Sequence, residues 1–209
     1  MREDFTNTAL IIIDVQRAFE DEKWGTRNNL NAEENIQILL KTWREKEYPI
    51  IHIQHLSDNN KSIFHPSKQS SDFKDIAVPV KDETIFKKKV NSAFIGTGLE
   101  EHLKENKIEK VVIVGLTTPH CVSTTTRMSG NLGFETYLVS DATAAFAIKG
   151  ADNTYYSAEE IHNVSLATLD DEFATVLTTE ELIRKLILTE KYSLKSFVLT
   201  VYRIQIQLT

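Results

Sequence analysis

The sequence predicts an α/β domain in which a parallel sheet carries helices on both faces. Short runs of apolar, largely β-branched residues recur along the chain, as is typical of strands that are buried on both sides. Segments with apolar residues at helical spacing stand between these runs. This alternation indicates parallel strands joined by helices, and it extends over residues 1–190, which we take as one domain.

Six strands and five helices are expected within this domain. The polar segment Leu56–Val80 has no clear periodicity, so we interpret it as a functional loop or partial lid. The predicted strands are Thr8–Val15, Ile50–Gln54, Thr84–Lys89, the run from Val111 that stops at Gly115, Phe134–Val139 and Glu172–Leu177. The predicted helices are Asn28–Lys46, Leu99–Asn106, a segment that follows Cys121 and ends at Gly133, Ser157–Leu169 and Thr178–Leu188.

The tail over residues 191–209 does not fit this plan. Its stretch SFVLTVYRIQIQLT alternates like a strand, but it follows the element that should complete the domain. An extra edge strand, a subunit-exchange arm and an appended stretch stay open as interpretations.

The composition bears on partners and location. The chain has 209 residues, and its hydrophobic content of 41% and charged content of 26% are those of a soluble globular protein. A net charge of −6 with both signs interspersed argues against nucleic acid or an anionic membrane as a partner. The single cysteine, Cys121, excludes an internal disulfide and suits a reducing compartment. Since neither a signal peptide nor a membrane-spanning run is visible, we expect a cytoplasmic protein.

Cys121 is the candidate nucleophile. It lies where the apolar strand from Val111 passes through the polar turn Gly115–Pro119 into the first turn of a helix. Unpaired N–H groups at a helix N-terminus lower the pKa of a thiol and can hold an oxyanion. A lone cysteine can also be a small buried hydrophobe. Its place at the carboxyl end of a strand, where open sheets bind ligands, favours the nucleophile.

Asp14 is the second candidate, because it ends the first apolar run. A carboxylate there is costly to bury, so it is expected to pair with a cation or to take part in chemistry. Phe19 and Trp24 follow in a loop, and their rings are candidate walls of a pocket.

Four motifs, in order, give the chain a family resemblance. It resembles the isochorismatase-like cysteine hydrolases, a family that includes nicotinamidases, N-carbamoylsarcosine amidohydrolases and ureidoacrylate hydrolases. The resemblance covers roughly Thr8 to Leu188. The motifs are LIIIDVQ in the first strand, KVNSAF at Lys89–Phe94, GLTTPHCV at Gly115–Val122 and SDAT at Ser140–Thr143.

The resemblance implies a three-layer α/β/α sandwich with a six-stranded parallel sheet, a Rossmann-like arrangement. It implies a catalytic triad of Cys121 as nucleophile, Asp14 as general base and Lys89 as the cation that holds both. It also implies a cis peptide bond between Leu116 and Thr117, with the N–H groups of Thr117 and Cys121 as an oxyanion hole. We further expect a homo-oligomer, whose order the residues do not specify.

The choice of Lys89 depends on the family motif alone. Three lysines stand in a row, and strand alternation gives Lys87 and Lys89 one face and Lys88 the other. Spacing therefore does not single out Lys89, and a solvated charge is the alternative interpretation. Only the match of the following residues, VNSAF, favours it.

No metal or other cofactor is expected. Many nicotinamidases hold an ion with an Asp-x-His after the second strand, and this chain has none there. His52 and His55 should point to opposite faces of a strand and so cannot share an ion. A weak site of His55, His65 and Asp58 stays open. We interpret His55 as a pocket-lining donor, with further substrate contacts predicted from Phe19, Trp24, Phe94, His120 and Tyr155.

The leading hypothesis is a metal-independent hydrolase that cleaves amide or ureido C–N bonds of small molecules through a thioester. An isochorismatase-type enol-ether hydrolysis, driven by Asp14 without a cysteine, is the alternative within the fold. A scaffold domain without activity would need none of Asp14, Lys89 and Cys121. A nucleotide-binding domain lacks support, because no Gly-x-Gly-x-x-Gly follows the first strand.

Overall fold

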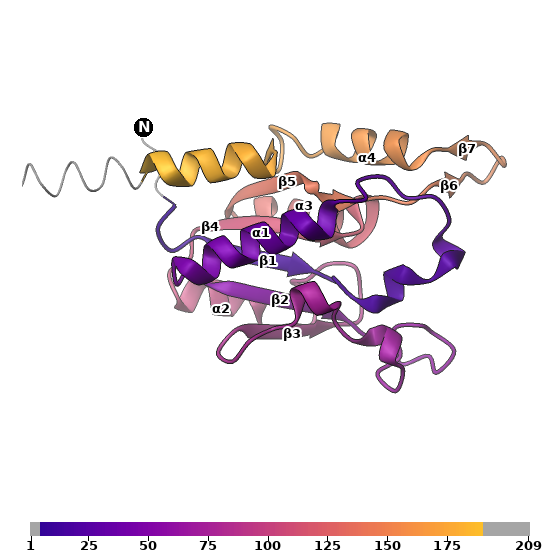
Figure 1. The fold of residues 1–209 in the computed structure, drawn as a ribbon, viewed down its shortest axis with the longest axis horizontal. Coiled ribbons are helices and arrows are strands. Elements are labelled where there is room, and N and C mark those ends of the chain that lie inside the picture. The colour runs from indigo at the N-terminus through magenta and orange to yellow at the C-terminus, as the bar shows by residue number, and fades with distance from the viewer. Residues whose placement is uncertain (1–4, 190–209) are drawn as a thin grey trace, which may run out of the picture.

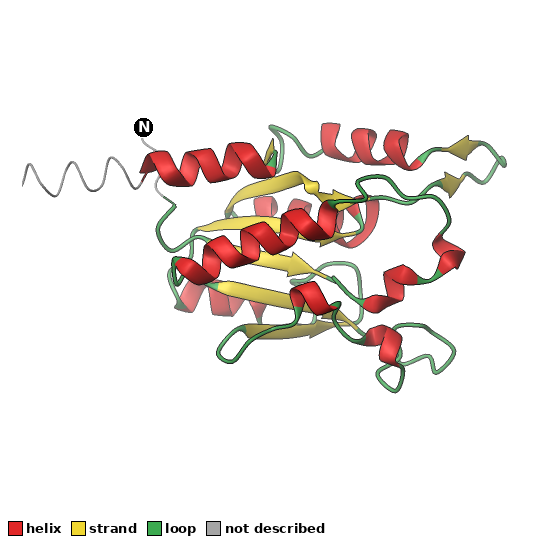
Figure 2. Ribbon diagram, in the orientation of Figure 1, coloured by secondary structure: helices red, strands yellow, loops and turns green. Residues whose placement is uncertain are grey.

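Six parallel strands form the central sheet of the structure, a computed structural model that describes residues 5–189. The strand order is β3-β2-β1-β4-β5-β8 (Figures 1 and 2). This confirms the predicted α/β class and the six-stranded sheet. Residues 191–209, the tail with the open interpretations, lie outside the described residues. The strands are β1 (Ala9–Ile13), β2 (Ile50–His55), β3 (Thr84–Lys88), β4 (Lys110–Leu116), β5 (Glu135–Ala144) and β8 (Thr175–Leu177).

Helices cover both faces of the sheet, as expected. On one face α1 packs through Ile36, Leu39 and Trp43, together with a helix over residues 179–189 that contributes Leu182 and Leu186. On the other face α2 and α3 cover β1 and β4. Within residues 5–189, no helix combines the length and the apolar composition that a membrane span requires. The labelled helices are α1 (Ala32–Glu45), α2 (Leu99–Glu105), α3 (Ser123–Asn131) and α4 (Ala158–Ala167).

Some boundaries differ from the sequence prediction. The first helix begins at Ala32 rather than Asn28, because Asn28 and Asn29 use their side chains to bind the backbone of β5 and the segment that follows it. Strand β5 continues past Val139 to Ala144, since its far end pairs again with Gly115 and Leu116 of β4. A two-stranded hairpin, β6 (Ile148–Lys149) and β7 (Tyr155–Tyr156), stands between β5 and α4, where the sequence predicted neither a strand nor a helix.

Gly115 is required where β4 leaves the sheet toward Cys121. Its φ is 120°, and a Cβ there would lie 2.1 Å from the carbonyl oxygen of Ile13. Any other residue would push β1 and β4 apart at their carboxyl ends. These are the ends that carry Asp14 and Cys121.

Candidate active site

Asp14 follows the last residue of β1 and is fully buried. Its φ of 50° is left-handed, a conformation that Asp adopts more readily than most residues. The backbone N–H donates to the carbonyl of Ile53, 3.0 Å away, and the carbonyl accepts from the N–H of Gln16 at 2.8 Å. These bonds fix the carboxylate at the carboxyl edge of the sheet.

Lys88, the last residue of β3, is the cation next to Asp14. Its Nζ lies 2.6 Å from Oδ2 of Asp14, 3.2 Å from Sγ of Cys121 and 3.0 Å from Nδ1 of His55. The side chain is fully buried, and three acceptors match the three donors of an ammonium. One buried cation therefore joins the carboxylate, the thiol and the imidazole.

The predicted placement of Lys89 in this cluster is wrong. Lys89 follows the strand and is exposed, and its Nζ pairs with Oδ2 of Asp58 at 2.7 Å. Within β3 the inward side chains are Thr84, Phe86 and Lys88, so the last strand residue carries the cation. Lys88 is the candidate site residue that the sequence reasoning missed. The sequence held one indication: Lys88 stands two residues after Phe86 and so shares its face of the strand. Ile85 places an equally apolar residue on the opposite face, so the pattern did not decide between the two faces.

Cys121 lies in a π-helical turn, Thr118–Val122, that leads directly into α3. The peptide bond between Leu116 and Thr117 is cis, as the resemblance implied. The predicted lowering of the cysteine's pKa is wrong. Burial and the neighbouring Asp14 raise the pKa of the Cys121 thiol to about 12, and the opposing charge of Lys88 does not cancel them. The resting side chain is accordingly a neutral thiol at neutral pH.

The two oxygens of the Asp14 carboxylate differ in their hydrogen-bond partners. Burial raises its pKa, and Lys88 opposes that rise through its charge and hydrogen bond. Oδ2 accepts from Lys88, whereas the buried Oδ1 has no hydrogen-bond partner among residues 5–189. A buried carboxylate oxygen without a donor is costly. Oδ1 is therefore suited to accept a proton from an incoming group or from the thiol.

His55 is a neutral member of the cluster. Burial and the charge of Lys88 lower its pKa to about 4. Because Nδ1 faces the ammonium, it accepts, and the ring proton resides on Nε2. His52 lies elsewhere, with its Nε2 2.8 Å from a carboxylate oxygen of Glu83, so the two histidines do not converge. Gln16 holds the backbone of His55 in place, since its side-chain amide donates to the carbonyl of that residue and accepts from its N–H.

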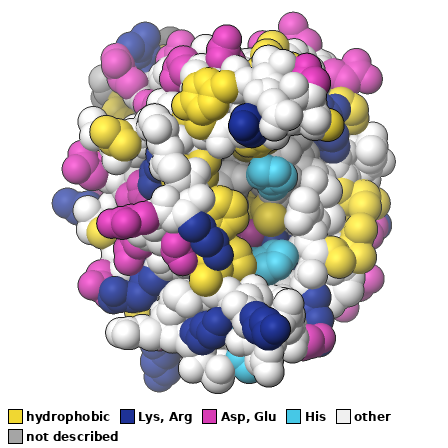
Figure 3. All heavy atoms as spheres, turned by 90° about the vertical axis from the view of Figure 1, so that its right-hand side faces the viewer, with side chains coloured by type: hydrophobic (Ala, Val, Ile, Leu, Met, Phe, Trp, Pro, Cys, Tyr) yellow, Lys and Arg dark blue, Asp and Glu magenta, His cyan; other side chains and the backbone are white. Residues whose placement is uncertain are grey.

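A cavity of about 230 Å³ opens onto the cluster. Figure 3 looks onto this edge of the molecule, where a hollow contains histidine and hydrophobic side chains and has Lys or Arg side chains at its border. Of the residues predicted to contact the substrate, the cavity includes Phe19, Trp24, His55 and His120, and it also includes Thr117 of the predicted oxyanion hole. Phe64 and Asn91 also line it, and neither was predicted as a contact.

Two residues predicted to contact the substrate, Phe94 and Tyr155, do not line this cavity. Phe94 packs in the core against Phe134, with ring centroids 6.0 Å apart, and it does not line the cavity. Tyr155 lies exposed on the β6–β7 hairpin. An aromatic residue is as often part of the hydrophobic core or the surface as of a pocket, so residue type alone did not show which aromatic residues line the cavity. Phe64 comes from the Leu56–Val80 loop, which therefore does reach the site.

Comparisons with known proteins give the chain its family. Residues 8–181 match the model of the isochorismatase domain. The chain belongs to the isochorismatase family. The uncharacterized isochorismatase family protein YrdC of Bacillus subtilis (strain 168) is 62% identical over 181 residues, which cover 87% of this chain and 97% of YrdC. Nicotinamidase 3 of Arabidopsis thaliana is 32% identical over 106 residues, 51% of this chain and 48% of that protein.

A solved structure supports the same assignment. An isochorismatase-family protein from Chromobacterium violaceum ATCC 12472 superposes with a TM-score of 0.86 at 38% identity, covering 89% of this chain and 96% of that one. The family resemblance drawn from the motifs is thereby confirmed, and the chain is an isochorismatase-family hydrolase.

The cluster of Asp14, His55 and Cys121 does not suit a metal ion. Asp14, His55 and Cys121 offer ligand atoms within 4.8 Å of one another. The ammonium of Lys88 bonds all three, so a dication would have to displace a buried positive charge. Among the described residues, His55, His65 and Asp58 do not bring their ligand atoms together as that group does; Asp58 pairs with Lys89, and Nδ1 of His65 bonds Ser67.

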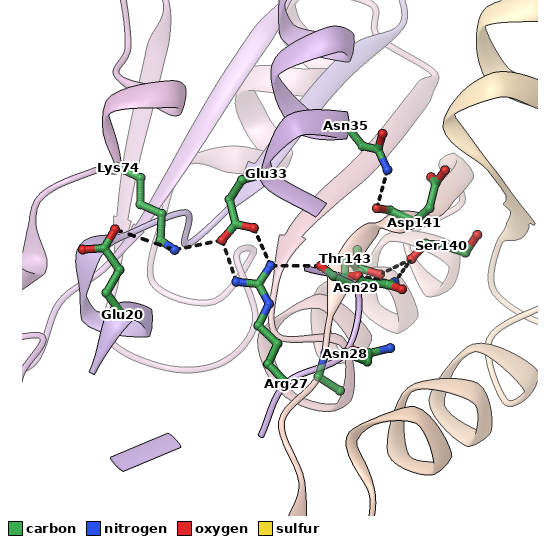
Figure 4. Close-up of polar contacts among 11 residues, drawn as sticks. Glu20, Arg27, Asn28, Asn29, Glu33, Asn35, Lys74, Ser140, Asp141 and Thr143 are labelled. Carbon is green, nitrogen blue, oxygen red and sulfur yellow. Dashed lines mark hydrogen bonds and ion pairs between the residues drawn. The ribbon is translucent and has the colours of Figure 1, made fainter. Parts of the chain in front are cut away.

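A second charged cluster brings together side chains from the segment before α1, from α1 and from the segment between β2 and β3 (Figure 4). Arg27 holds both carboxylate oxygens of Glu33, and Lys74 adds a contact of 2.8 Å to one of them. Arg27 also pairs with the backbone of Phe146, whose ring stacks on Trp24 at 5.5 Å. We call Arg27, Glu33 and Lys74 the anchor cluster. Through Arg27, the anchor cluster connects α1 to the segment after β5 that carries Phe146.

Proposed function

We propose that the protein hydrolyses a C–N bond of small amides or ureides, with Cys121 as nucleophile, Asp14 as general base and Lys88 as the positioning cation. One observation carries the proposal: Lys88 bridges Asp14 and Cys121, while the second oxygen of the carboxylate has no partner among the described residues. The likeness to Nicotinamidase 3 supports amide hydrolysis as the reaction type.

The reaction begins with a neutral thiol. Cys121 Sγ attacks the carbonyl carbon as its proton moves to Oδ1 of Asp14, so no free thiolate has to exist at rest. Lys88 balances the charge that develops between the sulfur and the carboxylate. The N–H groups of Thr117 and Cys121 are proposed to receive the carbonyl oxygen as it becomes an oxyanion.

Collapse of the tetrahedral intermediate breaks the C–N bond. The proton on Asp14 passes to the leaving nitrogen, and ammonia or an amine departs while the acyl group remains on sulfur as a thioester. Asp14 then takes a proton from water, whose oxygen attacks the thioester carbon. The acid is released as the C–S bond breaks, and the proton returns to the thiol.

Enol-ether hydrolysis of the isochorismatase type is the second candidate. The observation that favours it is the raised pKa of Asp14, because a carboxyl that holds a proton can deliver it to carbon without any nucleophile on the enzyme. This reaction would leave Cys121 idle.

A panel of primary amides and ureido acids, assayed by ammonia release, tests the proposal. Cys121→Ala should lower kcat/KM by about 10⁴-fold or more, and Cys121→Ser should be nearly as inactive, because a hydroxyl is much harder to ionise. Both variants should keep the melting temperature, since only one small side chain changes at a pocket rim. A Cys121→Ala protein that works at near the wild-type rate would exclude the thioester and favour the Asp14-driven reaction.

A further inference from the structure

A second cavity, of about 290 Å³, adjoins the reactive one. The two share Trp24, Thr117 and His120, so a molecule that enters the first can extend into the second. We call the second one the outer cavity. Beyond the shared residues, the side chains used below are Lys23, Phe146 and Lys149.

The charged residues that line the outer cavity are both lysines. Lys23 comes from the short turn Glu22–Trp24 and Lys149 from β6, so two separate segments bring positive charge to one opening. Asp21 and Glu22 precede Lys23 in the chain but do not line the cavity. Within residues 5–189 neither ammonium pairs with a carboxylate, whereas the exposed Lys89 pairs with Asp58.

The other titratable group of the outer cavity is not positive. Burial lowers the pKa of His120, and its Nδ1 lies 3.0 Å from the hydroxyl of Thr117. The imidazole is therefore neutral at neutral pH and offers hydrogen bonding only. In the inner cavity, the charge of Asp14 is balanced by Lys88. The net charge that a substrate meets at the opening comes from Lys23 and Lys149.

Aromatic contacts join the two segments that carry the lysines. Trp24 stacks on Phe146 at 5.5 Å and packs at a tilt against Phe19 at 5.2 Å, and its indole N–H donates to the carbonyl of Ala18. Lys23 precedes Trp24, and Lys149 follows Phe146 by three residues in the chain. The aromatic stack thus sets the relative position of the segments that carry the charges.

We propose that the outer cavity binds a carboxylate, so that the substrate is an amide or ureide of a molecule that also carries a carboxylate beyond its reacting carbonyl. This inference rests on the proposed function, since it takes Cys121 as the atom that meets the carbonyl. A carboxylate bound by Lys23 and Lys149 places binding energy away from the reacting bond, where it orients the substrate along the two cavities. Neutral amides lack that contact and react less well.

Alkylation of Cys121 by a matched pair of reagents tests the charge preference without turnover. N-Bromoacetylglycine carries a carboxylate, and its methyl ester is the neutral partner; in both, the sulfur displaces bromide. Rates are measured by mass spectrometry at one pH near 9 and divided by the rates with 2-mercaptoethanol. The wild type should prefer the carboxylate reagent by roughly tenfold, and the preference should fall in high salt.

The double variant Lys23→Gln/Lys149→Gln should lose that preference, with relative rates within about twofold of each other. Lys41→Gln, which removes one charge from the exposed face of α1, should keep it. Equal relative rates in the wild type, or a preference that survives in the double variant, would overturn the inference. A failure of the proposed function is separate, because it would appear as hydrolysis that persists in Cys121→Ala while the alkylation preference stays unchanged.

Discussion

Asp14 and Glu33 are both carboxylates that lie beside a lysine, but their surroundings differ. Glu33 is held at both oxygens by Arg27 and once more by Lys74. Burial opposes its ionisation, yet these contacts outweigh burial and lower the pKa of Glu33 to about 2. Asp14 has one cation, which it shares with Cys121 and His55, and burial raises its pKa.

We interpret this difference as one between an anchoring carboxylate, Glu33, and the proposed general base, Asp14. The carboxylate of the anchor cluster is saturated with donors, so it stabilises the fold and is a poor proton acceptor. Asp14 keeps one buried oxygen without a partner among residues 5–189, and this oxygen is available to a proton. The number of hydrogen-bond partners and the direction of the pKa shift together indicate which of the two carboxylates is suited to proton transfer.

Exchange of each acid for its amide should give the largest contrast in activity. Asp14→Asn should lower kcat/KM by about 10³-fold, because the base is lost, and asparagine tolerates the φ of 50°. Glu33→Gln should change kcat/KM by less than about tenfold. Ammonia release, corrected for folded protein, measures both. Equal losses in the two variants would remove the distinction between anchor and reactive carboxylate.

The neighbouring lysines offer a second contrast within one segment. Lys88→Gln should lower kcat/KM by about 10²-fold or more, since the buried charge that bridges Asp14 and Cys121 disappears. Lys89→Gln should leave kcat/KM within about twofold, because an exposed pair contributes little. Thermal melts of both variants separate folding from activity. A large loss in Lys89→Gln with an active Lys88→Gln would restore the motif-based choice.

The anchor cluster should show its effect in stability instead. The folded pKa of Glu33, about 2, lies below its ordinary value of 4.5, so its stabilisation is present above about pH 4.5 and is lost as the pH falls toward 2. Glu33→Gln should therefore destabilise the protein by about 3 kcal/mol at pH 7 and by much less near pH 3.

Urea unfolding at the two pH values measures this difference. Glu180→Gln, which removes a carboxylate from an exposed i,i+4 pair with Arg184, is the matched control and should have little effect at either pH. A destabilisation by Glu33→Gln that does not depend on pH would contradict the assigned role of its charge.

Most of the sheet followed from local pattern. Apolar runs located the six strands, and two polar residues that follow such runs, Asp14 and Cys121, became the candidate site residues. The pattern did not show which face of β3 is buried, because Ile85 and Phe86 are both apolar and point to opposite faces. In the structure β3 is an edge strand, in which Ile85 is exposed and Phe86 is partly buried. The choice between Lys88 and Lys89 depends on that face, which only the packing of β3 on β2 and α2 decides.

The chemistry of the cysteine was also beyond the reach of local pattern. A helix N-terminus predicts a lowered pKa, but burial and the proximity of Asp14 are tertiary properties, and both act in the opposite direction. Phe64 illustrates the same limit for the pocket. It comes from a loop without periodicity, and its contact with the ring of His55, at 5.1 Å, depends on how that loop folds over the sheet.

The coupling between Asp14 and Cys121 is most directly tested by the pH dependence of Cys121 alkylation with iodoacetamide. In the wild type the rate should be low at neutral pH and should keep rising beyond pH 8.5, the ordinary pKa of a thiol being ~8.5. In Asp14→Asn the whole profile should move to lower pH, because the negative charge that raises the thiol pKa is gone. A wild-type rate that levels off at or below pH 8.5, or a profile unchanged by Asp14→Asn, would contradict a neutral thiol activated by Asp14.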